Sequence, residues 1–178
     1  MCVSLQVSIV AGLIGVTSGI ILCKHSMSMG LWTITYSMIQ FAEALAYMKV
    51  DVSGFIVPLF HLQAIVGVGG HVLLDSNNSV LDLFLLFTVL YEFVQSIGKR
   101  MVISCDKGCK WTGSNNMLIS YIVLFIVGWR RGEMLMFLLH VALLFASKVI
   151  TGQNYPSYWC MSAAFAAPVM CVLSKLPS

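Results

Sequence analysis

A short group of polar side chains stands at helical spacing inside an apolar run, at residues 36–47. At positions i, i+4, i+7 and i+11 of this run stand Tyr36, Gln40, Glu43 and Tyr47. A helix would place all four in one stripe on one face, so that they can meet other helices rather than lipid. A charged carboxylate at mid-membrane is costly, so Glu43 would be protonated, paired or beside a water-filled cavity.

Three further polar residues fall in other apolar runs. His61 and Gln63 lie in the third run, and His140 lies near the middle of the sixth. Together with the stripe they form the predicted polar centre. One hypothesis is a pathway or pocket for protons, ions or a small ligand, because ionisable residues inside a membrane are usually functional. The other is that these groups only bond helices together, at about 1 kcal/mol each.

A second polar group is predicted near the end of the fourth apolar run. It consists of Glu92, Gln95 and Lys99. Glu92 and Lys99 are seven residues apart, so one continuous helix would carry both on the same face.

Signatures of catalysis are missing from the chain. Its last apolar run has no Lys before Lys175, where a retinal protein would need one, and no His for a zinc hydrolase. His61 and His71 do not have the spacing that brings two rings to one metal on a helix. No phosphate-binding glycine loop or potassium-filter motif is present. We therefore expect no catalytic residue, no metal and no cofactor, and a membrane enzyme is only the third alternative.

The composition points to lipid as the solvent. Of 178 residues, 59% are hydrophobic and 10% are charged, with a net charge of +3, whereas soluble domains are about half apolar and a quarter charged. The basic residues are too dispersed for nucleic-acid binding. The expected partner is a bilayer, of a cell, an organelle or the interior of a virion, and further copies of the chain or other membrane proteins remain open as partners.

Apolar runs divide the chain into candidate spans, since a crossing needs about 20 residues. They are 3–22, 30–48, 53–74, 79–98, 115–129, 133–150 and 156–174. We predict an all-α integral membrane bundle of about seven transmembrane helices, in a single domain over residues 1–178. Because the last three runs are short, six crossings are the alternative. The main hydrophilic loop is predicted at 99–114.

Basic residues and cysteines bear on orientation. Seven crossings put Lys49, Lys99, Arg100, Lys107, Lys110 and Lys148 on one side and Lys24, Arg130, Arg131 and Lys175 on the other. This six-to-four balance favours a cytoplasmic N-terminus. Cys105 and Cys109 share the hydrophilic loop, where they could form a disulfide in an oxidising space or stay as free thiols in the cytosol.

Several stretches together carry a family resemblance. They are the opening MCVS, then VSIVAGLIGV, SMIQFAEALAY, FHLQAIVG and NYPSYWCMSAAFAAP. The chain resembles an uncharacterised family of small polytopic membrane proteins of microbes, algae and large DNA viruses, whose members typically begin Met-Cys-Trp-Ser. The resemblance implies the motif positions Cys2, Ser4, Gln40, Glu43, Gln63, Trp159 and Cys160. Val3 and Ala64 depart from the family's usual Trp and Pro.

The family has no established biochemical activity, so the resemblance supports the membrane fold and the choice of Glu43 without supplying a function. From the residues, the leading hypothesis is a non-enzymatic channel, transporter or ligand-sensing bundle with its polar centre at Glu43. Its rival is a structural protein of a viral or organellar membrane, whose buried polar residues only pack helices.

Overall fold

The computed structural model describes residues 4–74, 79–105, 109–112 and 118–130, and single positions at 142, 146, 149, 168 and 169. The described elements are α1 (Leu5–Leu22), α2 (Met27–Tyr47), α3 (Ser53–Leu74), α4 (Val80–Ser96), β1 (Val102–Cys105), β2 (Cys109–Thr112) and α5 (Leu118–Arg130). Apart from those single positions, the predicted sixth and seventh spans lie outside the described residues.

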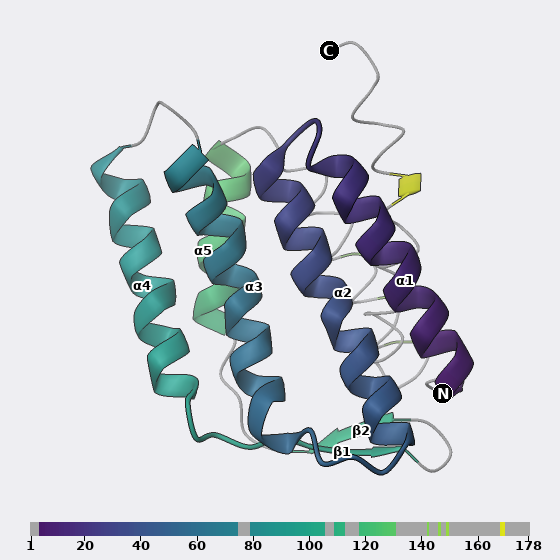
Figure 1. Ribbon diagram of the computed structural model, residues 1–178. Coiled ribbons are helices and arrows are strands. Elements are labelled where there is room, and N and C mark those ends of the chain that lie inside the picture. Colours follow the sequence, from purple (N-terminus) through teal and green to yellow (C-terminus); the bar gives the residue numbers. More distant parts are fainter. Residues whose placement is uncertain are drawn as a thin grey trace.

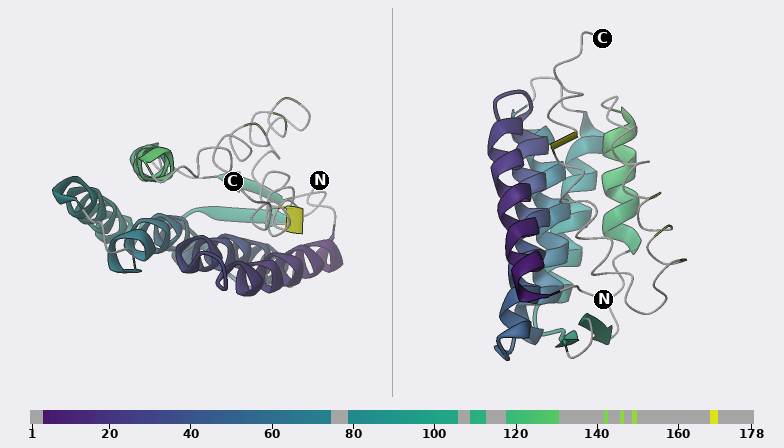
Figure 2. Two further views of the ribbon diagram at one scale, coloured as in Figure 1. Left: turned by 90° about the horizontal axis from the view of Figure 1, so that it is seen from above. Right: turned by 90° about the vertical axis from the view of Figure 1, so that its right-hand side faces the viewer.

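Helices α1 to α4 stand side by side in one layer, and α5 begins a second layer behind α3 and α4 (Figures 1 and 2). Successive helices alternate in direction. The start of α1, the α2–α3 turn and the hairpin therefore lie at one end of the bundle, which we call the hairpin end. The α1–α2 turn lies at the opposite end (Figure 1).

Serine side chains mark where three helices begin. The Oγ atoms of Ser4, Ser26 and Ser79 accept hydrogen bonds from the third residue along, at 3.3 Å in each case. Such caps satisfy backbone N–H groups that the first helical turn leaves without a partner. In α4 the cap is reciprocal, because Asp82 Oδ2 also accepts from the backbone N–H of Ser79, at 2.9 Å.

A short hairpin lies inside the region predicted as the main hydrophilic loop. Strands β1 and β2 pair antiparallel inside the region 99–114, and the register sets Val102 opposite Thr112 and Cys105 opposite Cys109. β-Branched and aromatic residues such as Val102, Ile103 and Trp111 favour extended pairing. The described structure remains mostly helical, with one short two-stranded sheet.

Small residues let α1, α2 and α3 approach closely. A Cβ atom added to Gly12 would meet the Phe41 ring at 2.8 Å, and one added to Gly30 would meet the Cα atom of Cys23 at 2.7 Å. Between α2 and α3, the Ser28 hydroxyl donates to the Gly67 carbonyl at 3.0 Å. Ser28 near the start of α2 therefore lies opposite the C-terminal half of α3.

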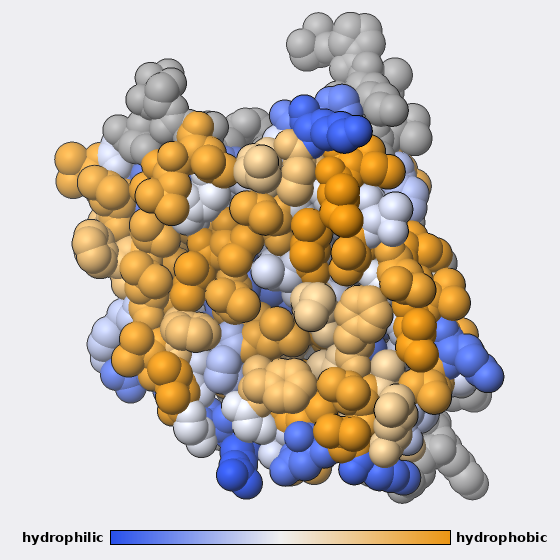
Figure 3. All heavy atoms as spheres, viewed as in Figure 1, coloured by the Kyte–Doolittle hydropathy of each residue, from blue (hydrophilic) through white to orange (hydrophobic). Residues whose placement is uncertain are grey.

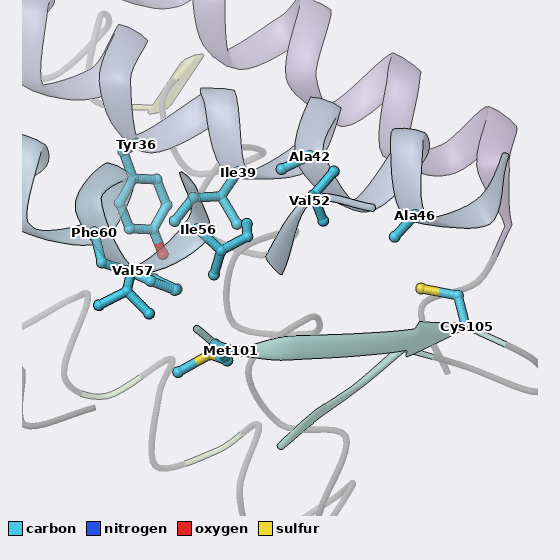
Figure 4. Close-up of a cluster of buried hydrophobic side chains, with 10 residues drawn as sticks. All are labelled: Tyr36, Ile39, Ala42, Ala46, Val52, Ile56, Val57, Phe60, Met101 and Cys105. Carbon is cyan, nitrogen blue, oxygen red and sulfur yellow. The ribbon is translucent and has the colours of Figure 1, made fainter. Parts of the chain in front are cut away.

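Two apolar clusters fill the interior. One joins α2, α3 and the hairpin, and it includes Ile39, Ala46, Ile56, Met101 and Cys105 (Figure 4). The other joins α3, α4 and α5 through Ala64, Val68, Val72, Leu85, Val89, Val123 and Val127. Both clusters leave the opposite side of the α1–α4 layer uncovered.

That uncovered side is hydrophobic. Figure 3 shows apolar side chains over most of its height, with hydrophilic residues gathered at the two ends. Exposed apolar side chains occur on every helix of the layer, and they include Leu13, Met38, Phe55, Phe84 and Phe87. We call this side the outer face. The side that meets α5 and the hairpin is the inner face.

Two of the described helices, α1 and α3, are both long enough and apolar enough to cross a bilayer. Helix α2 has 21 residues, but its Ser, Thr, Gln and Glu side chains make it less apolar. Helices α4 and α5 have 17 and 13 residues. The seven-span bundle stays a prediction.

Candidate functional site

The polar stripe of α2 points away from the outer face. Gln40 and Glu43 are 1% and 0% exposed, and Tyr36 is buried as well, while Tyr47 is half-buried. On the opposite side of the same helix, Met38 is 43% exposed. Helical spacing thus separates an apolar outer side from a polar inner side, and Glu43 is enclosed by protein.

His61 forms a link between the two layers. It is 1% exposed, and its Nδ1 atom lies 2.9 Å from the hydroxyl oxygen of Ser120, which is also buried. His61 belongs to α3 and Ser120 to α5, so this hydrogen bond crosses between helices. Nothing in the sequence singles out Ser120, because one serine in an apolar run is as common in plain packing as in a site.

Gln63 lies on another side of α3. Two residues advance an α-helix by about 200°, so Gln63 and His61 point in nearly opposite directions. Gly67 and Gly70, four and seven residues beyond Gln63, share its side of the helix. A Cβ atom added to Gly67 would meet Leu124 of α5 at 2.7 Å and Trp32 of α2 at 3.3 Å, and one added to Gly70 would meet Ser28 of α2 at 2.9 Å. Gln63 therefore lies on a side of α3 that packs against α2 and also approaches α5.

The amide groups of two buried glutamines have incomplete hydrogen bonding. Within the described part of the chain, neither amide atom of Gln63 has a hydrogen-bond partner, and Nε2 of Gln40 has none. Gln63 is 1% exposed. Leaving a buried polar group without a partner costs about 1–3 kcal/mol, so such groups in a native protein call for a bound water, ion or ligand.

The packing of α2 against α3 places Gln63 and Glu43 at two different heights along the bundle. Since Ser28 is opposite Gly67, antiparallel packing places Gln63, one turn before Gly67, beside Trp32 and Tyr36. The rings of those two residues lie 5.4 Å apart, and Tyr36 points towards α3 (Figure 4). Glu43 is about 10 Å further along α2, towards the hairpin end, at about 1.5 Å per residue.

The predicted centre is therefore a column rather than one cluster. The upper level holds Gln63 with the aromatic pair, and the lower level holds Glu43, with Gln40 between them. His61 is bonded to Ser120 on the side of α3 that faces α5. The structure does not bring His61 to Glu43 through its described contacts, and His140 lies outside the described residues.

The second predicted group is not assembled. Helix α4 ends at Ser96, followed by extended backbone at Ile97 and by Gly98 at a φ of +84°. Lys99 therefore lies beyond the helix, and the expected face shared with Glu92 is not formed. Glu92 is half-buried and Gln95 is exposed. No ion pair joins Glu92 to Lys99.

Two other acidic residues have local partners. Asp82 is buried, and its carboxylate completes the cap of α4 by accepting from the backbone and hydroxyl of Ser79. Asp51 lies in the exposed α2–α3 turn and accepts from the backbone N–H of Ser53 at 2.9 Å. That backbone bond, together with a side-chain bond to Ser53, lowers the pKa of Asp51 below its usual value of 3.8.

Within residues 4–74, 79–105, 109–112 and 118–130, no three His, Cys, Asp or Glu side chains converge as metal ligands would. Comparison with protein-family models, curated proteins and solved structures finds no match. The family resemblance in the sequence therefore stays a prediction. What the geometry offers is a carboxyl group, two amides and an aromatic pair enclosed between helices, a set that can bind a small polar or cationic species.

Proposed function

We propose that the chain is an integral membrane protein, an all-α bundle of about seven spans, that admits a small polar solute or cation to its interior. One observation carries this proposal: the described layer exposes large apolar side chains and buries several large polar ones. Large apolar side chains cover the outer face, whereas Gln40, Glu43 and Gln63 are enclosed on the inner side. A protein surrounded by water would gain nothing from this arrangement, but lipid favours it.

The buried amides support binding rather than packing alone. A protein selected only for stability would replace Gln63 by an apolar residue of similar size, because its amide finds no partner among the described side chains. A solute with both donors and acceptors could satisfy that amide beside Trp32 and Tyr36. Glu43 would supply a negative charge or a proton at the next level, so the column suits a channel, a transporter or a ligand sensor.

Flux through liposomes tests this function. Purified parent protein is reconstituted, and proton and monovalent-cation entry is followed with dyes, beside a Glu43→Gln variant. We expect flux in the parent and at least a tenfold loss in Glu43→Gln, with an unchanged melting temperature. Glu92→Gln is the matched control, since it makes the same change at a half-buried carboxylate outside the column, and it should keep parental flux.

A structural role is the second candidate, favoured by the His61–Ser120 hydrogen bond between layers. On this account the buried polar groups hold helices together in a cellular, organellar or virion membrane. It predicts no flux in any of the three proteins and a clear loss of stability in Glu43→Gln. An inactive parent with an equally stable variant would leave ligand sensing, which binding assays on the same samples address.

A further inference from the structure

The hairpin contains two cysteines whose positions fit one covalent bond. Cys105 is disulfide-bonded in the structure. In the strand register, its direct partner across the ladder is Cys109. Residues directly opposite in an antiparallel pair have Cα atoms about 4.5–5.5 Å apart, within the 4.4–6.8 Å span of disulfides. Cys23, by contrast, is a free thiol at the opposite end of the bundle.

We propose that Cys105 and Cys109 form a disulfide that staples the hairpin, and that the hairpin end of the bundle faces an oxidising compartment. This orientation rests on the proposed membrane location. Disulfides form and persist in secretory, periplasmic and extracellular spaces, whereas cytosolic thiols are kept reduced. The two thiols each lose a proton and an electron as the sulfur–sulfur bond forms. A disulfide oxidant of that compartment accepts both electrons and both protons and becomes a dithiol.

The charge pattern gives the opposite orientation. Lys49, Lys99 and Arg100 are exposed at the hairpin end, and Lys24 is exposed at the other. The basic residues of the whole sequence favour a cytosolic hairpin end by only six to four. The margin of two residues is a statistical preference, whereas a disulfide requires an oxidant. We therefore give the disulfide more weight, which reverses the orientation expected from the charges and places the start of α1 on the oxidising side.

The hairpin that this disulfide holds together also covers the end of the bundle next to Glu43. Cys105 is buried, and its sulfur points towards Ala46 of α2 (Figure 4). At the start of the hairpin, the backbone N–H of Met101 donates to the carbonyl of Ser53 at 3.2 Å. Ala46 is one helical turn from Glu43, so the hairpin covers the end of α2 that leads to that carboxyl group. Holding the two strands together keeps this cover in place.

Peptide mapping tests the bond. The full-length protein is extracted from membranes with N-ethylmaleimide present and digested with trypsin without reductant. Cleavage after Arg100, Lys107 and Lys110 puts Cys105 and Cys109 on separate peptides, 101–107 and 108–110. We expect these peptides to be joined, and to separate on reduction. Alkylated thiols at both positions, or Cys105 joined to another cysteine, would overturn the pairing.

Cysteine accessibility tests the orientation. Sealed endoplasmic-reticulum microsomes, whose outer surface is cytosolic, receive a membrane-impermeant maleimide. The Lys24→Cys and Val50→Cys variants place an exposed thiol at the opposite end and the hairpin end, and the parent corrects for native thiols. We expect added labelling of Lys24→Cys in sealed vesicles, but of Val50→Cys only after detergent. The reverse pattern would overturn the orientation, whereas labelling of both in sealed vesicles would overturn the membrane location.

Discussion

Helix α2 packs in two different ways on its two sides. Towards α1 it meets small residues, and Gly12, Gly19 and Gly30 let backbones and side chains come into direct contact. Towards the inner face it presents Gln40 and Glu43, large polar side chains that are almost fully enclosed. The first interface needs no partner groups, because close van der Waals packing is enough. The second gains stability only if its polar groups are bonded.

The α1–α2 interface stabilises the fold, whereas the buried polar groups of the inner face are the candidates for binding a solute. Changes at the α1–α2 interface should cost stability, whichever function is correct. Changes at the buried amides should cost function and, where hydrogen bonds are incomplete, gain stability. The two sides of one helix therefore predict effects of opposite sign, and single substitutions can separate them.

Gly30→Ala should have the largest effect. Its new Cβ atom would lie 2.7 Å from the Cα atom of Cys23, so the backbones of α1 and α2 must move apart. We expect a loss of about 3 kcal/mol in the free energy of unfolding, at the upper end for overpacking. Gly54→Ala is the control, because nothing lies within 4 Å of its added Cβ atom. Denaturation in detergent measures both, and equal stability of the two variants would refute close packing as the basis of this interface.

Gln63→Met should change stability in the other direction. It keeps the size of the side chain and removes an amide with no partner among the described residues. We expect a gain of about 1–2 kcal/mol, because the cost of burying an unsatisfied polar group disappears. Solute flux or binding should fall in the same variant. Gln95→Met, at an exposed amide, should leave both unchanged, and a less stable Gln63→Met would mean that the amide is bonded in the resting protein.

Ser120→Ala should cost about 1 kcal/mol, the usual net worth of a hydrogen bond between helices. The change removes the 2.9 Å contact between the serine hydroxyl and His61 Nδ1. Ser120→Thr keeps the hydroxyl and serves as the control. If the alanine variant unfolds at the same denaturant concentration as the parent, the bond does not hold α5 to α3.

Asp51→Asn should produce the smallest effect, a loss of stability that is present near neutral pH and disappears in acid. Its pKa is lowered in the folded protein, chiefly by the backbone hydrogen bond from Ser53. A lowered pKa means that the charged carboxylate stabilises the fold above the usual value of 3.8, and that this contribution is lost as pH falls through the lower, folded value. Parent and Asp51→Asn melting curves, recorded from pH 6 to pH 2, should therefore converge in acid. Parallel curves would contradict this assignment.

The sequence predicts the described helices because apolar runs are local signals. Residues 53–74 are predicted and found as one helix, whereas α2 begins at Met27, after its Ser26 cap and three residues before the predicted start at residue 30. The hairpin was missed because its strands are only four residues long, inside a segment rich in Gly, Cys and charge. The end of α4 was missed because Gly98 stops the helix before Lys99.

The candidate site is less predictable, since it depends on how helices are set against each other. Spacing within α2 is enough to group Gln40 with Glu43, because both belong to one helix. That Gln63 faces α2 while His61 bonds α5 follows only from the register between helices, which a single sequence does not contain. Ser120 was not identified for the same reason.

The central claim is that lipid meets the outer face while the polar side chains of α2 are enclosed. Spin labels at Met38, on the outer face, and at Lys24, in the exposed α1–α2 turn, test it most directly in reconstituted bilayers. We predict that dissolved oxygen relaxes the Met38 label strongly and a water-soluble nickel chelate hardly at all, with the reverse at Lys24. Nickel access at Met38 equal to that at Lys24 would contradict the account, since the outer face would then lie in water.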